Sequence, residues 1–238
     1  MKIIIYLSLI LFASNALAYS TNYLMLPNNE TLTAQKWRID TRSHFNVDKR
    51  YSDTQAIPPS TSLGATYGIF DNQELSVEAG LDWFEPTTQD NLNALRTHGK
   101  FLVSQNASPI SVAIGFYEYA FKTNANSPNI LYLQFEKKWD LTGAFKIGYF
   151  SGNSEVMVNE NFQASNKGII AGWARPLPEL INSLTLSAEW MGSQSYKGGA
   201  LIGTSWKLQN ATFKIGYFIP TNKRIIRDSI FAQLNVDL

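Results

Sequence analysis

Acidic side chains recur at every fourth position in the segment from Glu74 to Trp83. Glu74, Glu78 and Asp82 share one face of this segment when it is extended. The residues on the opposite face, from Leu75 to Trp83, are all apolar. A face with three carboxylates can serve in catalysis, hold a metal ion or pair with cations. It needs water or cationic partners, because an unpaired buried charge is costly.

Cations follow in the same pattern on the next segment, from Leu95 to Val103. Arg96, His98 and Lys100 share one face of that segment. Two neighbouring strands of a meander place such residues opposite the carboxylates of the first segment. We therefore interpret the two faces as a ladder of ion pairs between adjacent strands.

The two histidines, His44 and His98, are the candidates for proton transfer. Outer-membrane phospholipases and lipid A deacylases carry His-x-Ser on one strand, but here Ser43 is adjacent to His44 and falls on the opposite face. The neighbouring cations make His98 a poor proton acceptor unless a carboxylate offsets them. His44 could form an acid and histidine pair with Asp40 or Asp82 only if these strand ends converge. We expect no catalytic set, no metal site and no cofactor, so the chain is not predicted to be an enzyme.

The alternation that positions these groups continues along most of the chain and predicts an all-β protein. About twelve strands are expected, and an even number returns the last strand beside the first. The prediction is a closed, antiparallel, up-and-down transmembrane β-barrel over residues 34–238. The expected strands are Lys36–Asn46, Ser62–Phe70, Glu74–Trp83, Leu95–Val103, Ile110–Phe121, Ile130–Lys138, Phe145–Phe150, Gly168–Arg175, Leu184–Met191, Ala200–Leu208, Phe213–Ile219 and Ser229–Leu238.

The connections between these strands alternate in length. Those after even-numbered strands are short, as at Asp71-Asn72, and those after odd-numbered strands are mostly long, as at Val47–Thr61 and Ser151–Asn166. Transmembrane barrels have this arrangement, with the long loops outside the cell and both termini in the periplasm. The tryptophans fall near the strand ends and predict two aromatic girdles at the membrane interfaces; they are Trp37, Trp83, Trp139, Trp173, Trp190 and Trp206.

The polar face decides between a membrane barrel and a soluble one. A secreted β-sandwich or a lipocalin-like barrel would show the same alternation with the apolar set inward. Here the face opposite the apolar set is rich in glycine, as at Gly64, Gly148 and Gly216, and its charges cluster. Small residues and paired charges suit a confined lumen. The charged fraction of 16% and the aromatic fraction of 13% also suit a surface that faces lipid.

The first 18 residues are typical of a secretory signal peptide. Lys2 provides the positive start, Ile3–Phe12 the apolar run and Ala16–Ala18 the cleavage pattern. A lone membrane anchor is the alternative, but the apolar run is shorter than the roughly 20 residues that a spanning helix needs. We expect export, and a periplasmic arm over residues 19–33 ahead of the barrel. The sequence leaves the role of this arm open, and folding into the lumen as a plug is one alternative.

Composition excludes several classes of site. Without cysteine, disulfides, a thiolate nucleophile, a cysteine zinc site and a lipidated cysteine are all excluded. The net charge of +1 provides no basic face for nucleic acid.

The ends of the predicted barrel resemble known outer-membrane proteins. The last strand alternates from Ile230 to an apolar final residue, Leu238, and looks like the terminal signature by which bacterial outer-membrane barrels are recognised by the barrel-assembly machinery. Leu26-Pro27, Lys36–Ile39 and Tyr67–Asn72 resemble a group of porin-like outer-membrane proteins. The resemblance implies a β-barrel in the outer membrane of a Gram-negative bacterium, in contact with lipid and lipopolysaccharide.

A narrow channel for small polar solutes is the leading functional hypothesis. Twelve strands about 4.8 Å apart and tilted by roughly 40° give a backbone diameter of about 24 Å, which can leave a passage of several ångström. If the charged side chains form ion pairs across the bore and close it, the protein is instead a closed structural or adhesive barrel that acts through its loops. A hydrolase at the rim is the third hypothesis. The residues expected to line the lumen are Arg38, Asp40, Arg42, His44, Glu74, Glu78, Asp82, Arg96, His98, Lys100, Glu136, Lys146, Glu189 and Lys214.

Overall fold

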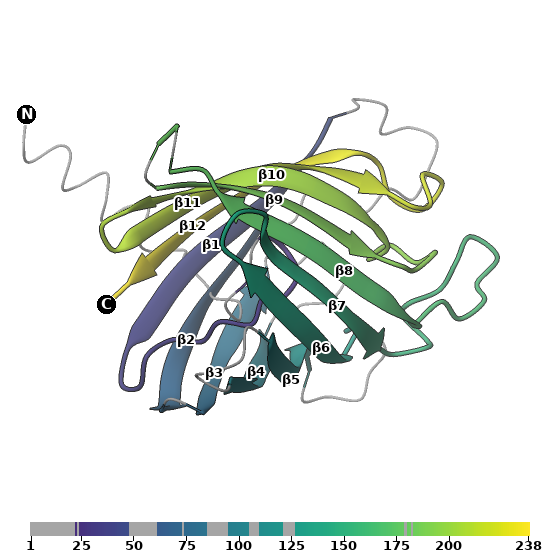
Figure 1. Cartoon of the computed structure of the whole chain (residues 1–238). Helices are drawn as coiled ribbons and strands as arrows, with labels where there is room; N and C mark the ends of the chain where they lie inside the picture. Colours follow the sequence, from purple (N-terminus) through teal and green to yellow (C-terminus); the bar gives the residue numbers. More distant parts are fainter. Residues whose placement is uncertain are drawn as a thin grey trace, which may run out of the picture.

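The chain forms a closed β-barrel (Figure 1). The computed structural model describes residue 22 and residues 24–47, 61–72, 74–84, 95–104, 110–120, 127–178, 180–181 and 183–238. Within these ranges every strand is antiparallel to its neighbours, and β1 pairs with both β2 and β12, which closes the sheet. The strands are β1 Trp37–Asn46, β2 Thr61–Asp71, β3 Leu75–Phe84, β4 Leu95–Ser104, β5 Ile110–Tyr119, β6 Ile130–Trp139, β7 Gly143–Ser151, β8 Lys167–Pro176, β9 Leu184–Met191, β10 Gly199–Leu208, β11 Ala211–Pro220 and β12 Ser229–Asp237.

The predicted barrel of twelve strands is confirmed. The predicted signal peptide, residues 1–18, lies outside the described residues. So does most of the long connection between β1 and β2, from residue 48 to residue 60. No helix in the part of the chain that the structure describes is long and apolar enough to cross a membrane.

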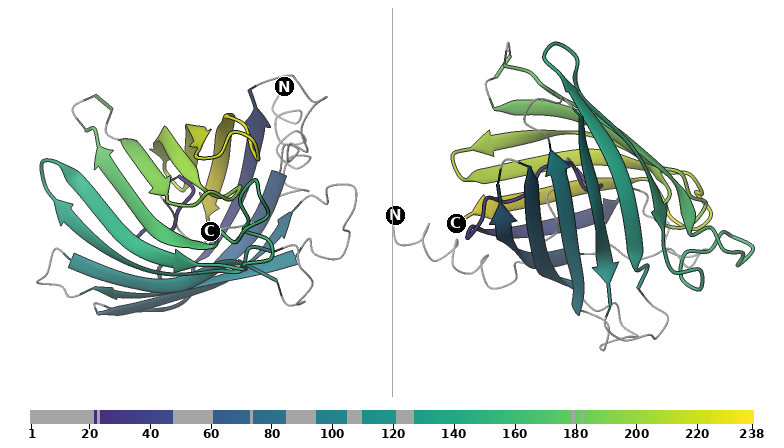
Figure 2. Two further views of the ribbon diagram at one scale, coloured as in Figure 1. Left: turned by 90° about the vertical axis from the view of Figure 1, so that its right-hand side faces the viewer. Right: turned by 60° about the horizontal axis from the view of Figure 1, so that its bottom comes forward.

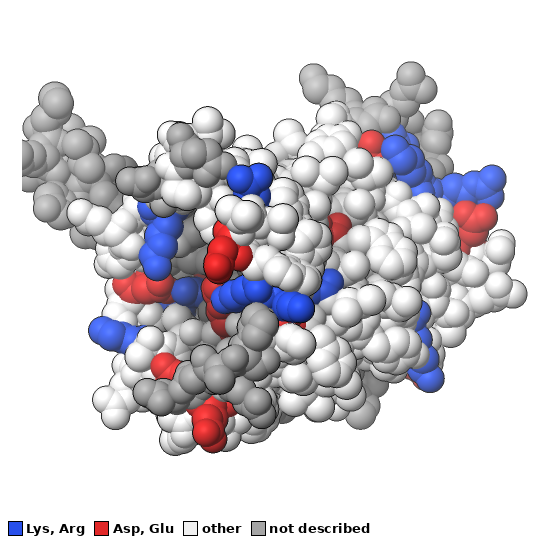
Figure 3. Space-filling model, viewed as in Figure 1, with Lys and Arg blue, Asp and Glu red and all other residues white. Residues whose placement is uncertain are grey.

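Successive side chains along each strand point alternately out of the barrel and into it. In β6, Leu131 is 53% exposed on the outside, whereas Tyr132 and Gln134 are buried inside. Large apolar side chains are exposed in the same way on every strand, and the charged residues gather near the two ends of the barrel (Figure 3). A continuous apolar surface of this size is not stable in water, so the barrel spans a membrane.

The two ends of the barrel differ, as the loop lengths predict. One end, here called the short-turn mouth, carries the tight turns and the C-terminus (Figure 1). The other, here called the loop end, carries the long connections. One of these, over residues 152–166, is a hairpin in which Val158 bridges Ala164.

A β-bulge near the loop end of β5 interrupts the alternation. Residues Phe116 to Tyr119 of β5 lie opposite only Thr97 to Gly99 of β4, so β5 carries one extra residue there. Glu118 adopts a φ of 51° at this point, and both Tyr117 and Glu118 are buried. The bulge turns the Glu118 side chain inward, although an unbroken alternation would place it outside.

Apolar side chains fill the loop side of the interior. Tyr117, Tyr132, Phe150 and Met191 belong to one buried cluster on the walls of β5 to β9. A second cluster joins Leu201, Phe218 and Phe231 on β10 to β12. Each cluster also contains a leucine from the segment that precedes β1, Leu26 in the first and Leu24 in the second.

Candidate functional site in the barrel lumen

The segment ahead of β1 lies inside the barrel. We call residue 22 together with residues 24–33 the arm. Leu24 and Leu26 are fully buried, and the arm contacts side chains from β3, β4, β6, β7, β9 and β11, which lie all round the wall. Figure 2 shows this purple segment within the ring of strands. The sequence predicts a periplasmic arm over residues 19–33, and the described part of it occupies the lumen instead.

The arm folds back on itself within the lumen. Asn22 and Pro27 form an antiparallel bridge, and Leu24 and Leu26 lie between them. Lys36, which follows the arm, is at the short-turn mouth because β1 begins there. The arm therefore leaves through this mouth, and its fold-back inside the lumen gives it the shape of a plug.

Three wall carboxylates accept hydrogen bonds from the arm backbone. Glu189 Oε2 accepts from the N–H groups of Met25 and Leu26, at 2.7 and 3.0 Å. Glu78 Oε2 accepts from Leu32 N–H at 2.9 Å, and Glu136 Oε2 accepts from Asn29 N–H at 3.3 Å. An irregular segment inside a barrel has no ladder partner for these N–H groups, so the wall satisfies them.

Wall lysines donate to carbonyl oxygens of the arm. Lys146 Nζ donates to Pro27 O at 2.8 Å and to Leu26 O at 3.3 Å. Lys100 Nζ donates to Asn28 O at 3.1 Å. Lys214 Nζ donates to Asn22 O at 2.7 Å. The wall thus forms hydrogen bonds with both the N–H groups and the carbonyl oxygens of the arm.

The same charged residues also pair with one another. Lys100 Nζ lies 3.1 Å from Glu78 Oε1, and Lys146 Nζ lies 2.8 Å from Glu189 Oε1. All four side chains are buried. Because each ion pair keeps one side of its charge turned to the arm, the pairs and the plug form one connected network.

Gln134 on β6 adds a contact that the pattern of charges does not indicate. Its Nε2 donates to Pro27 O at 3.0 Å and to Asn29 Oδ1 at 2.7 Å. A single uncharged residue on the polar face carries no sequence signal for this role.

His98 lies in a buried chain of hydrogen bonds. Its Nδ1 is 2.8 Å from Asp82 Oδ2, and its Nε2 is 3.0 Å from Thr66 Oγ1. This order of groups is the one that activates a hydroxyl nucleophile. All three side chains have no exposed surface, however, so a substrate has no approach to the Thr66 hydroxyl. The imidazole ring lies over Gly80, where any larger side chain would collide with it.

Arg96 and Glu118 pair at the loop end. Arg96 Nη1 lies 2.8 Å from Glu118 Oε2, so Arg96 pairs with the bulged residue of β5 rather than with the facing carboxylates of β3. Lys197, from the connection between β9 and β10, reaches the same carboxylate at 2.5 Å from Oε1. This connection therefore folds inward and is tied to the opposite wall. Neither Glu118 nor Lys197 could be identified from alternation, because one lies in a bulge and the other in a loop.

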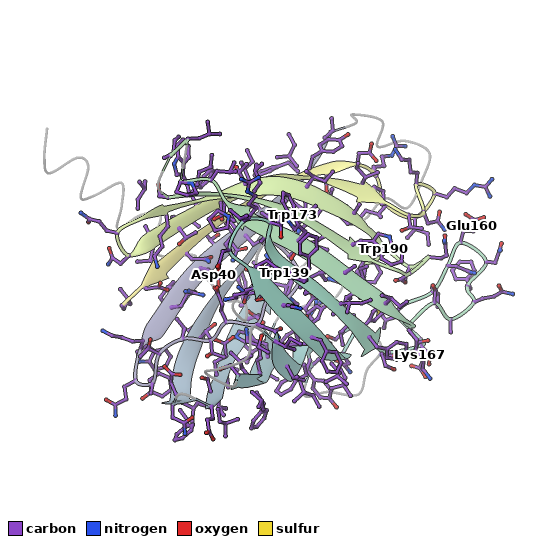
Figure 4. All side chains as sticks on the ribbon, in the orientation of Figure 1. Asp40, Trp139, Glu160, Lys167, Trp173 and Trp190 are labelled. Atoms are coloured by element: carbon purple, nitrogen blue, oxygen red, sulfur yellow. The ribbon has the colours of Figure 1, made fainter. Side chains whose placement is uncertain are left out.

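The remaining residues predicted to line the lumen lie at several depths. Asp40 and Arg42 are buried inside the barrel, and Figure 4 labels Asp40 there. His44 is partly buried beside Phe231, with ring centroids 5.4 Å apart. Glu74 does not line the lumen: it lies in the turn between β2 and β3 with an exposed side chain, because β3 begins one residue later than predicted.

The tryptophans lie near the ends of the outer wall. Trp139 and Trp173 are at the short-turn side, and Trp190 is toward the loop end (Figure 4). Trp173 is partly buried and donates from Nε1 to Thr142 O at 2.7 Å. The others are more exposed; they are Trp37, Trp83, Trp139, Trp190 and Trp206.

A cavity of about 440 Å³ opens at the short-turn mouth, between the arm and the wall. Arg38 on its rim is held by two hydrogen bonds to Asp237, with Nε 2.6 Å from Oδ1. Among the described residues no group of three or more His, Asp or Glu side chains could hold a metal ion. The charged residues of the cavity lining are Arg38, Lys138, Arg175, Lys207 and Lys214 together with Glu30, Asp140 and Asp237.

Several solved structures align with this chain over most of its length. The KdgM porin aligns with a TM-score of 0.49 and 10% identity, over 84% of this chain and 97% of that one. An outer-membrane channel from Pseudomonas putida F1 aligns with a TM-score of 0.48 and 10% identity, over 93% of this chain and 100% of that one. Salmonella typhi OmpF in complex with daunomycin aligns with a TM-score of 0.44 and 7% identity, over 86% and 97% of the two chains.

No protein-family model and no curated protein matches the chain. At these identities the similar structures carry no argument about function, which rests on the contacts inside the barrel.

Proposed function

We propose that this protein is an outer-membrane channel for small polar solutes, and that its own arm closes the channel in the state described here. The observation that carries the proposal is the way in which the lumen is filled. A small barrel that serves only as a scaffold can fill its interior with side chains of its own wall. In this barrel a separate chain segment fills the centre, and its C-terminal end leads into β1.

The contacts that hold the arm support a reversible closure. Hydrogen bonds and ion pairs in the lumen exchange readily with water once the arm moves, whereas a packed apolar core would not. Among the described residues of the arm, Leu24 and Leu26 belong to the apolar clusters, and Met25 packs against the second of them. When the arm leaves, both signs of charge face the passage, including Lys100, Lys146 and Glu189. Such a lining favours polar and charged solutes over apolar ones.

The size of the passage follows from the number of strands. Twelve strands give a backbone diameter of about 24 Å, and wall side chains reduce the free bore to several ångström. Small solutes can pass through such a bore, and folded polymers cannot.

Conductance in planar bilayers tests the proposal. The full-length protein is expected to conduct rarely, and a variant that lacks residues 22–33 is expected to conduct steadily. Folding of both proteins is checked by the shift in their migration on SDS gels before and after boiling. A deletion variant that folds as a barrel but does not conduct would overturn the proposal.

A reducible tether provides the matched control. The side chains of Asn29 and Ser111 touch, with Nδ2 2.9 Å from Oγ, and the chain has no native cysteine. The double variant Asn29→Cys with Ser111→Cys is therefore expected to stay closed when oxidised and to regain openings after reduction. Openings that are equally frequent in both states would show that the arm does not close the lumen.

One observation favours the alternative of a barrel that acts through its loops. Phe162, at the tip of the hairpin over residues 152–166, is 82% exposed, so this hairpin presents an aromatic ring that a partner could bind. If the deletion variant stays closed, shortening this hairpin and measuring binding of cells to surfaces tests the alternative.

A further inference from the structure

The cavity at the short-turn mouth has the size and the polarity of a small-molecule site. Its volume of about 440 Å³ lies within the range of ligand pockets. Its lining comes from both the arm and the wall, since Asn22 and Asn28 lie on one side and Thr212 and Lys214 on the other. A molecule in this cavity therefore contacts the plug and the channel wall together.

Two amide side chains of the arm line the cavity, and each has one buried hydrogen-bonding group that is unused. Asn22 and Asn28 are 7% and 3% exposed, so both are buried by more than nine-tenths. The Nδ2 donor of Asn22 and the Oδ1 acceptor of Asn28 have no hydrogen-bond partner among the described residues. Buried polar atoms normally have partners, so a donor and an acceptor left unpaired beside one cavity favour a ligand toward which both amides can turn.

The charge of the lining indicates the sign of the ligand. Five cations and three carboxylates line the cavity. Two of the carboxylates, Asp237 and Glu30, already pair with Arg38 and Lys138. The positive excess favours an anion.

Hydroxyl groups complete the lining. Ser183, Thr185, Ser205 and Thr212 bring side-chain hydroxyls to the wall of the cavity. Each hydroxyl can donate one hydrogen bond and accept others. Several such groups around a cation suit a ligand that itself carries several hydroxyls.

We infer that the cavity at the short-turn mouth binds a small organic anion that carries several hydroxyl groups, and that the arm supplies half of the site. The inference rests on the proposed function, because it names the class of solute that meets the closed channel. The arm amides bind hydroxyls of the ligand, and the cationic wall faces its anionic group. Because the site includes the arm, the ligand binds the closed state and is lost when the arm is absent.

Calorimetric titration of the full-length protein in detergent, at low salt, tests the inference with three probes. Gluconate carries both a carboxylate and several hydroxyls, glucose lacks the charge, and hexanoate lacks the hydroxyls. Gluconate is expected to bind at least about tenfold more tightly than either of the others, which corresponds to the loss of one or two hydrogen bonds to charged or buried groups. Absence of gluconate binding, or equal binding of glucose, would overturn the inference.

Substitutions then locate the site. Asn22→Ala and Asn28→Ala are each expected to weaken gluconate binding by about fivefold or more. Thr212→Val changes the wall, leaves the arm intact and is also expected to weaken gluconate binding. This variant tests the site even if an arm variant fails to fold. Asn161→Ala, at an exposed position of the loop end, is the matched control and is expected to bind normally. Normal binding by both arm variants and by Thr212→Val would place the ligand elsewhere and overturn the inference.

The deletion of residues 22–33 separates this inference from the proposed function. A deletion variant that conducts and no longer binds gluconate supports both. If it conducts but the full-length protein binds no gluconate, the channel stands and the inference fails. If the full-length protein binds gluconate but the deletion variant does not conduct, the site stands and the channel fails.

Discussion

Lys146 and Glu189 meet across an intervening strand. Lys146 projects from β7 and passes over Gly172 of β8 to reach Glu189 on β9, with Nζ 2.8 Å from Oε1. Glu189 also accepts the N–H of Leu26, and Lys146 donates to the carbonyl of the same residue. One buried ion pair therefore joins three consecutive strands to the arm.

Replacing one partner of this pair should destabilise the barrel and loosen the arm. Lys146→Met leaves the Glu189 carboxylate buried without its cation, and the loss is expected to be about 3–5 kcal/mol in the free energy of unfolding. Unfolding in urea, followed by tryptophan fluorescence, measures the loss, and bilayer recordings are expected to show more frequent opening.

The double variant Lys146→Met with Glu189→Gln is expected to recover part of this stability, because it removes both charges. Lys137→Met, at a partly exposed neighbouring position on β6, is the control and should change little. Unaltered stability of the single Lys146 variant would contradict the role of the pair.

Two glycines should differ in their tolerance of a methyl group. At Gly172 an added Cβ would first meet side-chain carbons of Lys146, and these can shift without movement of the backbone. At Gly80 it would collide with the Ala65 backbone carbonyl and with the His98 ring, neither of which can move easily. Gly80→Ala is expected to lower stability by about 1–3 kcal/mol, more than Gly172→Ala does. Urea midpoints compare the two, and the reverse order would contradict the described packing of His98.

The tryptophan positions predict contact with lipid. Five of the six tryptophans are well exposed on the outside of the barrel near its ends. In vesicles of brominated lipid, tryptophan emission is expected to fall by roughly half or more, because bromine quenches rings at the membrane interfaces. Iodide in the water should quench the emission much less. Strong quenching by iodide together with weak quenching by brominated lipid would show that these faces are not in a membrane.

Acid should weaken one anchor of the arm at the short-turn mouth. Burial raises the pKa of the Glu30 carboxyl, but Lys138, 3.3 Å away, has the opposite effect, and the net pKa lies below the model-peptide value of 4.5. A lowered pKa in the folded state means that the contact is fully present above pH 4.5 and is lost as the pH falls through the lowered pKa.

The opening frequency of the full-length protein is therefore expected to rise modestly below pH 4.5. Glu30→Gln should open more often at neutral pH and lose this part of the acid response. Both side chains are more than half exposed, so the effect is small in water. An identical acid response in the Glu30→Gln variant would assign it to other groups.

Alternation predicted the strands because every strand residue must face either lipid or lumen. The segment after Asn72 illustrates this: Leu75 and Leu81 are exposed outside, and Glu78 and Asp82 are buried inside. The expected ion pair between the facing residues Glu78 and Lys100 forms in the register that the hairpins impose. Glu74 is exposed in the turn instead of lining the lumen, because a strand boundary cannot be located within one residue from a pattern that continues into the turn.

The sequence by itself determined the barrel, the two sets of side chains along each strand and the asymmetry of the loops, because these depend on local periodicity and on turn residues. The tertiary structure alone decided that the arm fills the lumen, that Glu118 turns inward at a bulge and that Lys146 reaches over β8 to pair with Glu189. Those contacts join residues that are distant in the chain, and an irregular segment such as the arm carries no periodic signal. Its place becomes evident only when the closed wall presents carboxylates and lysines to its unpaired backbone groups.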